Sequence, residues 1–468
     1  MGLTETLADY FDVQEHGSSV RTELLAGLTT FLTMSYIVVV NPSILTAIPD
    51  VKPGIAIAGF SPTEVRSMLA VVTIIAAAVA TFVMAVYANR PFAQAPGLGL
   101  NAFFAFTVVG ALGVSWQTAL AAVVVEGVLF IALTAVGARE YVIKLFPKPV
   151  KFAVGTGIGL FLTIIGLQAM GIVVDDGATL VTMGQVASNP VAILSVFGLF
   201  VTFALYARGV RGSIIIGILF TTLVGWLLTA FGPYTPDAGL VAGGSGATYN
   251  ITPLTGAFVS GLGQIEAFSF ALVVFTFFFV DFFDTAGTLV GVGQAGEFLD
   301  DDGNLPDIDK PLMADAVGTT VGGMLGTSTV TTYIESASGV EEGGRTGLTA
   351  LTVAGLFLAS LAFVPLAAAI PLYASHIALV VIGVVMLQNV VDIDWSDVTN
   401  TIPAGMTILV MPFTYSIAYG IAAGIVSYPL VKLAAGDLED VRMGHWALAA
   451  AFVVYFFVRT SGLIQAQV

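Results

Sequence analysis

The sequence contains no cysteine, only 3 histidines, and only 10% charged residues. Without cysteine, disulfide bonds, thiolate catalysis and cysteine-ligated metal sites are excluded. Soluble domains carry about 25% charged residues, so the chain is not composed like one. The charges are also one-sided, with 31 acidic against 15 basic residues and a net charge of −16. This acidic balance argues against nucleic acid and anionic lipid as partners.

Hydrophobic residues, in contrast, make up 57% of the chain, and its mean hydropathy is +0.96. Nearly charge-free runs recur, for example over 68–88 and 347–370. Each run has about the 20 residues that a helix needs to cross a bilayer. We therefore interpret the chain as an all-α polytopic membrane protein. A polar, amphipathic leader over 1–23 precedes the first apolar run, and no small-residue cleavage site follows that run. We therefore expect no removable signal peptide.

About fourteen hydrophobic segments can be counted. They lie near 24–46, 68–89, 96–113, 118–137, 152–172, 189–206, 212–231, 267–292, 311–324, 325–340, 346–370, 374–391, 403–433 and 444–461. Three of them are short and rich in glycine, and 403–433 is long enough to be bent or split. With this count, eleven basic residues fall on the side of the two termini and four on the other side. Because basic residues favour the cytoplasm, we expect both termini on the cytoplasmic side of the cell membrane.

Two stretches of the first half are similar to two stretches of the second half, in the same order. Residues 117–130 match 345–358, and residues 158–168 match 377–388, at an offset of roughly 220–228 positions. Seven spans are an odd number, so a second copy of such a unit lies inverted in the membrane. Inverted repeats with interrupted helices are typical of secondary transporters. The pattern predicts a seven-plus-seven inverted repeat.

One short segment is unusually polar for its surroundings. The run "GTSTVTTYIESASG" over 326–339 combines glycines, hydroxyl groups, β-branched residues and Glu335. Applying the repeat offset to it reaches the glycine-rich run "APGLGLNAFFA" over 95–105. Extended backbone at membrane depth is tolerated where protein or a water-filled cavity satisfies it. We therefore expect two short extended segments, in spans 3 and 10, to frame a substrate cavity.

The apolar run "FFFVDFFDTAGTLVGVG" over 277–293 also contains acids. Asp281 and Asp284, with two threonines, share one face of the predicted helix. An acid at a helix centre costs about 2.5–3.5 kcal/mol and indicates function. A position at the membrane surface is the alternative, and the apolar residues on both sides argue against it. We expect both aspartates to meet Glu335 and Asn101 in one cavity.

Such a cavity has two chemical capacities. Carboxylates and amides pair with the N–H and C=O edge of a flat heterocycle. A buried acid that takes up a proton loses its charge, and this couples the proton to a conformational change. The residues thus indicate proton-coupled uptake of a small polar solute without identifying the solute.

Four runs identify a family. The stretches over 26–45, 95–109, 280–292 and 313–351 resemble the AzgA-like purine permeases of the nucleobase–ascorbate transporter superfamily. The resemblance implies fourteen spans in a core and a gate domain, elevator-like alternating access, a homodimer, and proton symport of hypoxanthine, guanine or adenine. The implied parts are core 24–145 (spans 1–4), gate 146–262 (spans 5–7), core 263–371 (spans 8–11) and gate 372–468 (spans 12–14).

The resemblance also assigns residues. Substrate positions of the family match Asn101, Asp281 and Glu335, and further positions important for transport match Gly99 and Asp284. We predict that the substrate is bound by Asn101, Asp281, Glu335, Gly99 and Thr332, and that Glu335, Asp281 or Asp284 carries the proton. Candidates for stacking on the base are Tyr36, Phe278, Phe282 and Phe283. No catalytic residue, cofactor or metal ligand is predicted.

Three other functions fit parts of the pattern. An anion carrier of the same fold is the main alternative, although three acids suit an anion poorly. A channel is disfavoured because a single clustered site suits binding better than multi-ion flow. An intramembrane aspartyl enzyme would need opposed carboxylates, whereas Asp281 and Asp284 lie three residues apart on one predicted helix.

Overall fold

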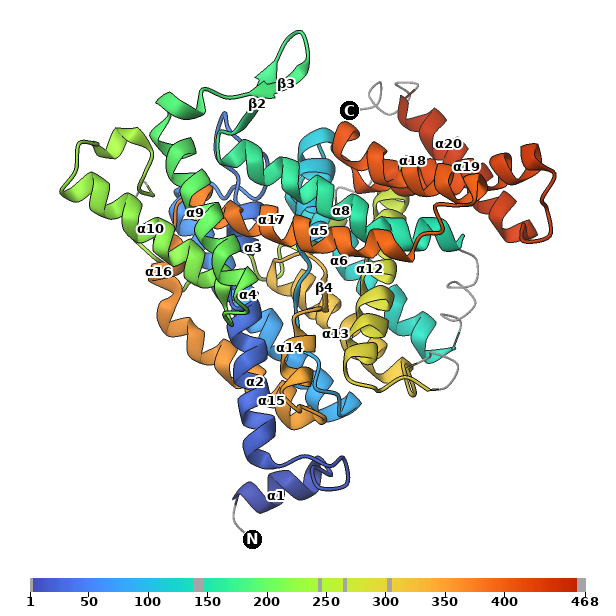
Figure 1. The fold of residues 1–468 in the computed structure, drawn as a ribbon, viewed down its shortest axis with the longest axis horizontal. Coiled ribbons are helices and arrows are strands. Elements are labelled where there is room, and N and C mark those ends of the chain that lie inside the picture. The colour runs from blue at the N-terminus through green and yellow to red at the C-terminus, as the bar shows by residue number, and fades with distance from the viewer. Residues whose placement is uncertain (1–2, 138–146, 243–245, 264–266, 301–304, 461–468) are drawn as a thin grey trace.

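The computed structural model of the protein describes residues 3–137, 147–242, 246–263, 267–300 and 305–460. Helices make up most of it, and they surround a pair of very short strands near the middle of the bundle (Figure 1). The predicted fold class is confirmed.

The elements have the following bounds. The helices are α1 (Leu3–Tyr10), α2 (Val20–Met34), α3 (Ile37–Leu45), α4 (Pro62–Val83), α5 (Leu98–Ala102), α6 (Trp116–Ala135), α8 (Lys148–Ala169), α9 (Pro190–Ala207), α10 (Ser213–Ala230), α11 (Phe258–Leu262), α12 (Ala267–Ala295), α13 (Asp309–Leu325), α14 (Ser336–Glu341), α15 (Gly347–Ala359), α16 (Val364–Ala369), α17 (Leu372–Met386), α18 (Val398–Thr414), α19 (Ile417–Ala435) and α20 (Met443–Thr460). The strands are β1 (Gln94–Pro96), β2 (Val173–Asp176), β3 (Leu180–Met183) and β4 (Val330–Thr332). A π-helical turn, Phe103–Ala111, continues α5.

Ten helices among the described residues are long and apolar enough to cross a membrane. The other predicted segments exist as shorter pieces. The segment predicted over 403–433 is two helices, α18 and α19, which meet at Tyr415. Tyr415 has a φ of 53°, in the left-handed region that ends a helix. The apolar composition is continuous through this turn, which is why composition alone did not separate the two helices.

The two predicted extended segments meet each other. Strand β1 pairs antiparallel with β4, with Gln94 opposite Thr332 and Pro96 opposite Val330. The pairing continues beyond the strands, because the Gly97 N–H donates to the Thr329 carbonyl at 3.0 Å. Backbone groups that leave a helix inside a membrane need such partners. Each interrupted segment therefore supplies the hydrogen bonds that the other one lacks.

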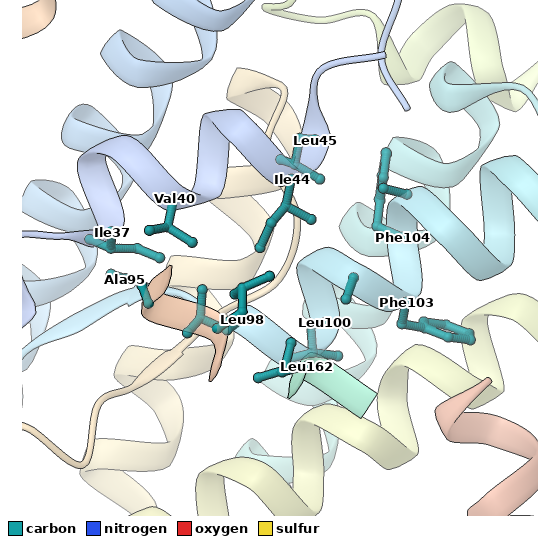
Figure 2. Close-up of a cluster of buried hydrophobic side chains, with 14 of the residues drawn as sticks. Ile37, Val40, Ile44, Leu45, Ala95, Leu98, Leu100, Phe103, Phe104 and Leu162 are labelled. Atoms are coloured by element: carbon teal, nitrogen blue, oxygen red, sulfur yellow. The ribbon is translucent and has the colours of Figure 1, made fainter. Parts of the chain in front are cut away.

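A large buried apolar cluster holds the first interrupted segment in place. Figure 2 shows Val40 and Ile44 of α3 above Leu98 and Leu100 of α5, with Leu162 of α8 in the same cluster. Full burial of such a side chain stabilises by roughly 1.5–3 kcal/mol. The glycine-rich segment is thus fixed by packing on its neighbours, since its own helix propensity is low.

The helices form two groups that pack mainly within themselves. In the first group, α4 packs on α3, α13 and α15, and α6 packs on α12 and α13. In the second, α8 packs on α17 and α18, and α9 packs on α10 and α17. Figure 1 shows α8 and α17 side by side across the top of the first group. The core and gate boundaries correspond to this grouping but stay a prediction, because the grouping does not show which parts move.

The position of the leader and a β-hairpin between two helices were not predicted. The leader helix α1 leads into Phe11 and Val13, which are buried against Leu348 of α15, so the leader is docked on the helix ends. Between α8 and α9, strands β2 and β3 form a hairpin that projects from the bundle (Figure 1).

Candidate functional site

A cavity of about 400 Å³ lies between the paired interrupted segments, α12, α8 and α17. Its size falls in the range of about 300–1,000 Å³ that is common for small-molecule sites. The two sides of the cavity differ in chemistry, and we name them by that difference. The polar wall consists of Tyr36, Gly97, Leu98, Gly99, Asp284, Gly287, Thr288, Gly291, Thr331, Thr332, Tyr333 and Glu335. The apolar wall consists of Val154, Ile158, Leu162, Ile382, Val385 and Met386.

Glu335 is held in the polar wall by a tyrosine. It lies just before α14, and the Tyr36 hydroxyl donates a hydrogen bond to Glu335 Oε1 at 2.5 Å. Tyr36 lies in the short connection between α2, which ends at Met34, and α3, which begins at Ile37. A carboxylate can accept about four hydrogen bonds. Glu335 therefore keeps acceptor capacity for a ligand.

Asp284 faces the same cavity from α12. Its carboxylate is hydrogen-bonded by the Thr331 side chain of the β4 segment. The next turns of α12 present Gly287, Thr288 and Gly291 on the same face. A Cβ added at Gly287 would meet nothing within 4 Å. The small residues of this face therefore create the space in front of Asp284.

Gly99 sets the distance between the two walls. A Cβ at this position would come within 2.9 Å of Ile158 Cγ2 on α8. Ile158 is only 2% exposed, so its side chain has little room to move away. The predicted importance of Gly99 thus has a steric reason: glycine allows α5 to approach α8 closely.

Two predicted substrate residues are engaged in joining the interrupted segments. Asn101 does not line the cavity; its side-chain oxygen accepts a hydrogen bond from the Ser328 hydroxyl. Thr332 does line the cavity, but its hydroxyl donates to Asp315 Oδ1 at 2.8 Å. Gln94 also donates to that aspartate. Both residues therefore stabilise the frame of the site.

Asp281 is not with the other acids. It is 1% exposed, does not line the cavity, and accepts a hydrogen bond from the Thr285 hydroxyl at 3.2 Å. Its acidic neighbour is Glu126 of α6, which is completely buried. The expectation that Asp281, Asp284 and Glu335 meet in one cavity is therefore wrong for Asp281. Asp284 and Glu335 line the cavity, and Asp281 forms a second pair with Glu126 outside its lining. The sequence carried a signal for Glu126, a lone acid in the apolar run "AVVVEGVLF", which the prediction missed.

The aromatic residues predicted to stack on the base do not all lie at the cavity. Tyr36 lines the cavity, whereas Phe278 and Phe282 stack against Phe130, with ring centroids 4.6 and 6.1 Å away. The side chain of Phe283 lies outside the described residues. Besides Tyr36, the aromatic rings at the cavity are those of Tyr333 and Phe152.

Polar side chains gather at one end of the cavity lining, beside the start of α8, and we call this end the mouth. Lys151, near the start of α8, and Asn389, after α17, line the mouth. The lining on α8 ends at Leu162, one to two turns before Gln168. There the Tyr415 hydroxyl donates to Gln168, and the Thr107 hydroxyl donates to the Tyr415 carbonyl at 2.9 Å. The first bond lies within the second helix group, and the bond from Thr107 ties the two groups together.

Metal binding finds no support in the part of the chain that the structure describes. No three histidine or acidic side chains lie there close enough to hold a metal ion. The polar wall of the cavity presents carboxylates and hydroxyl groups, and an ammonium group and an amide lie at the mouth.

Comparison with known proteins gives matches over most of the chain. The model of the xanthine/uracil permease group, described as "Permease family", matches residues 21–423. Guanine/hypoxanthine permease PbuO of Bacillus subtilis is 40% identical over 461 residues, covering 96% of this chain and 99% of that protein. Adenine permease AdeQ of Escherichia coli is 38% identical over 451 residues, covering 96% of each chain.

Among solved structures, the transmembrane domain of the cyanobacterial bicarbonate transporter BicA is similar. It has a TM-score of 0.60 at 15% sequence identity, over 89% of this chain and 97% of that domain. At this identity the similarity concerns the fold alone.

Proposed function

The chain belongs to the permease family whose model it matches over residues 21–423, and we propose that it imports purine nucleobases by proton symport. The polar wall supports this substrate class, because Asp284 and Glu335 face one cavity from two different elements. A neutral heterocycle with ring N–H groups offers donors to both acids. The names of the adenine and the guanine/hypoxanthine permeases are consistent with a purine.

In the proposed binding mode the two acids accept hydrogen bonds from the N–H edge of the base. Tyr36 orients Glu335 through its hydroxyl, and Thr331 orients Asp284 in the same way. The ring then lies against an aromatic side chain of the cavity, where stacking adds about 0.5–1.5 kcal/mol. Asp284 takes the substrate role that the sequence assigned to Asp281. Asn101 acts indirectly, through its bond to Ser328.

The proposed transport step is elevator-like. The predicted core, 24–145 with 263–371, contains the polar wall, and the predicted gate, 146–262 with 372–468, contains the apolar wall. The apolar wall offers the base no hydrogen bond, so the core and the bound base can move along it without breaking directional contacts. If both termini are cytoplasmic, as we propose, Lys151 and the mouth of the cavity face the cytoplasm. A homodimer completes the proposal.

The alternatives lose support at the same site. A small anion in the cavity would lie beside two carboxylates, and the lysine of the lining, Lys151, lies at the mouth, away from the polar wall that carries them. The similarity to a bicarbonate transporter therefore does not extend to its substrate. An aspartyl enzyme would need Asp281 and Asp284 to share one reaction space, and only Asp284 lines the cavity.

The test is uptake of radiolabelled hypoxanthine and adenine into proteoliposomes with an imposed pH gradient. We expect the wild type to accumulate at least one of these purines and to lose the accumulation when the gradient is collapsed. Glu335→Gln should bind and exchange purine weakly, because the amide presents an N–H group to the ring. Glu341→Gln, which changes an exposed acid of the same short helix, is the matched control and should behave like the wild type. Absence of purine uptake by the wild type would refute the proposal.

A further inference from the structure

A second pair of acids lies behind the cavity and has no part in the binding mode above. Glu126 comes from the middle of α6 and Asp281 from the middle of α12, and they are 0% and 1% exposed. Their carboxyl groups lie within hydrogen-bonding reach of each other. Hydroxyl groups hold the far sides of the pair: Thr329 donates to Glu126 Oε2 at 3.1 Å, and Thr285 donates to Asp281 Oδ1 at 3.2 Å.

Among the described residues, the charged group that acts on Glu126 is an acid and not a cation. The charged side chain beside it is Asp281. The nearest turns of α6 are apolar, and Gly127 packs on Thr320 of α13. The other titratable groups of the packed elements serve other contacts: Asp284 on α12 and Glu335 beyond β4 face the cavity, and Asp315 of α13 is bonded by Gln94 and Thr332.

The hydrogen bonds of Glu126 are incomplete. Its Oε1 is buried and accepts no hydrogen bond from the described residues. An ionised carboxylate only accepts, so two ionised acids in contact would repel each other in a medium of low dielectric constant. One proton between them makes one acid a donor and removes one of the two charges. A buried pair of this kind is a binding site for a proton.

We propose that Glu126 and Asp281 hold one shared proton and are the site that binds the transported proton. This inference rests on the proton symport proposed above. It separates the two ligands: the purine binds between Asp284 and Glu335, and the proton binds within one turn of α12 from there, where Asp281 meets Glu126 of α6. Glu126, which neither the sequence motifs nor the family resemblance singled out, is the new residue of the mechanism.

The structure provides a short connection between the two sites. Thr329 donates to Glu126 through its side chain and accepts from the Gly97 N–H through its carbonyl, and Gly97 lines the cavity. On α12, Asp281 and Asp284 lie within one turn of each other. When the proton leaves, the pair acquires a second negative charge, and repulsion acts directly on α6 and α12 and, through the bond from Thr329, on the segment that leads into β4. Helix α12 and strand β4 carry a substrate-binding acid and its hydroxyl partner.

The first arm of the test is spectroscopic and needs no substrate. Infrared difference spectra between acidic and alkaline buffer should show the carbonyl stretch of a protonated carboxyl group in the wild type. We expect this band to shift and to titrate over a different pH range in Glu126→Gln and in Asp281→Asn, because each variant leaves one carboxyl group beside an amide, and to stay unchanged in the exposed control Glu341→Gln. Two different variants are needed because one of them could fail to fold. A band unchanged in position and in titration range in both folded variants would overturn the proposal.

The second arm measures coupling in proteoliposomes. Glu126→Gln should still exchange labelled purine for unlabelled purine, but a pH gradient should no longer raise the internal purine concentration above the external one. Gradient-driven accumulation equal to that of the wild type would overturn the proposal, and so would accumulation driven by sodium instead of protons. A wild type that shows the Glu126-dependent band but transports no purine would refute the proposed function while the shared proton stands.

Discussion

The two walls of the cavity come from the same apolar bundle, but they present different chemical groups to a ligand. The polar wall brings Asp284 and Glu335 to the cavity, each held by a hydroxyl group, Thr331 or Tyr36. The apolar wall, on α8 and α17, presents aliphatic side chains such as Val385. One wall can therefore recognise a ligand by directional bonds, and the other can only exclude water from it.

The difference has a structural origin. The polar wall lies where helices are interrupted, at the β1–β4 pair and between α2 and α3, and where α12 carries acids and glycines. The apolar wall consists of uninterrupted helix. Interrupted backbone needs polar partners inside a membrane, and the hydroxyl groups that serve it can also position carboxylates. In this cavity the groups suited to recognition therefore lie at the interruptions of the helices, and the uninterrupted helices contribute aliphatic side chains.

The largest effect is expected from removing an acid of the polar wall. Asp284→Asn replaces an acceptor by a side chain that can present an N–H group to a ring N–H group. Loss of a hydrogen bond to a charged group, with a buried donor left unpaired, costs about 3 kcal/mol, or about 100-fold in the dissociation constant. Binding of labelled purine to the purified protein checks this. Unchanged affinity, in a variant with unchanged thermal stability, would show that the polar wall does not recognise the base.

A smaller effect is expected where the walls touch. Gly99→Val places methyl groups against Ile158, which a Cβ alone would already approach to 2.9 Å. Overpacking of this kind costs about 1–3 kcal/mol, so we expect transport to slow by about 30-fold with binding less affected.

The matched changes make the steric cause testable. Ile158→Ala in the same chain should restore most of the rate, because it removes the opposing side chain. Gly355→Ala, where a Cβ meets nothing within 4 Å, should transport normally. A Gly99→Val protein that the second change does not rescue would indicate that Gly99 serves the ligand and not the contact.

Next comes the hydroxyl group that holds Glu335. Tyr36→Phe keeps the ring at the cavity and removes the 2.5 Å hydrogen bond to Glu335. A hydrogen bond to a charged group contributes about 1.5–3 kcal/mol, so we expect purine affinity to fall by roughly 10-fold. Tyr36→Leu removes the ring as well, and a further loss in that variant would measure stacking. Equal affinities of Tyr36→Phe and the wild type would mean that Glu335 is oriented without Tyr36.

Much of the polar wall could be predicted from the sequence. The two interrupted segments were located through the repeat offset, and their pairing is the central feature of the fold. Glu335 was placed at the site because an acid in a membrane span is a costly and specific signal, and Gly99 was placed there by the family resemblance. Asp284 was recognised as well, although a lesser role was expected for it.

What could not be predicted is the direction in which each side chain points. Asp281 and Asp284 are three residues apart, so both fit one helical face, and only the neighbouring helices decide that one meets the cavity and the other meets Glu126. Likewise, Asn101 lies next to the cavity, yet its partner is Ser328 of the other interrupted segment. Contacts between segments far apart in the chain carry no local pattern, so the lone acid Glu126 in its apolar run did not indicate Asp281 as its partner.

The smallest effect is expected on the apolar wall, and a matched pair of substitutions measures the asymmetry directly. Val385→Thr adds one hydroxyl group to the apolar wall, and Thr331→Val removes one from the polar wall with little change in shape. Because Val385 makes no directional bond, we expect the first change to alter the purine dissociation constant by less than about 3-fold. The second removes the hydrogen bond to Asp284 and should weaken binding by about 10-fold. Similar effects of the two substitutions on purine binding would remove the distinction between a wall that recognises and a wall that only encloses.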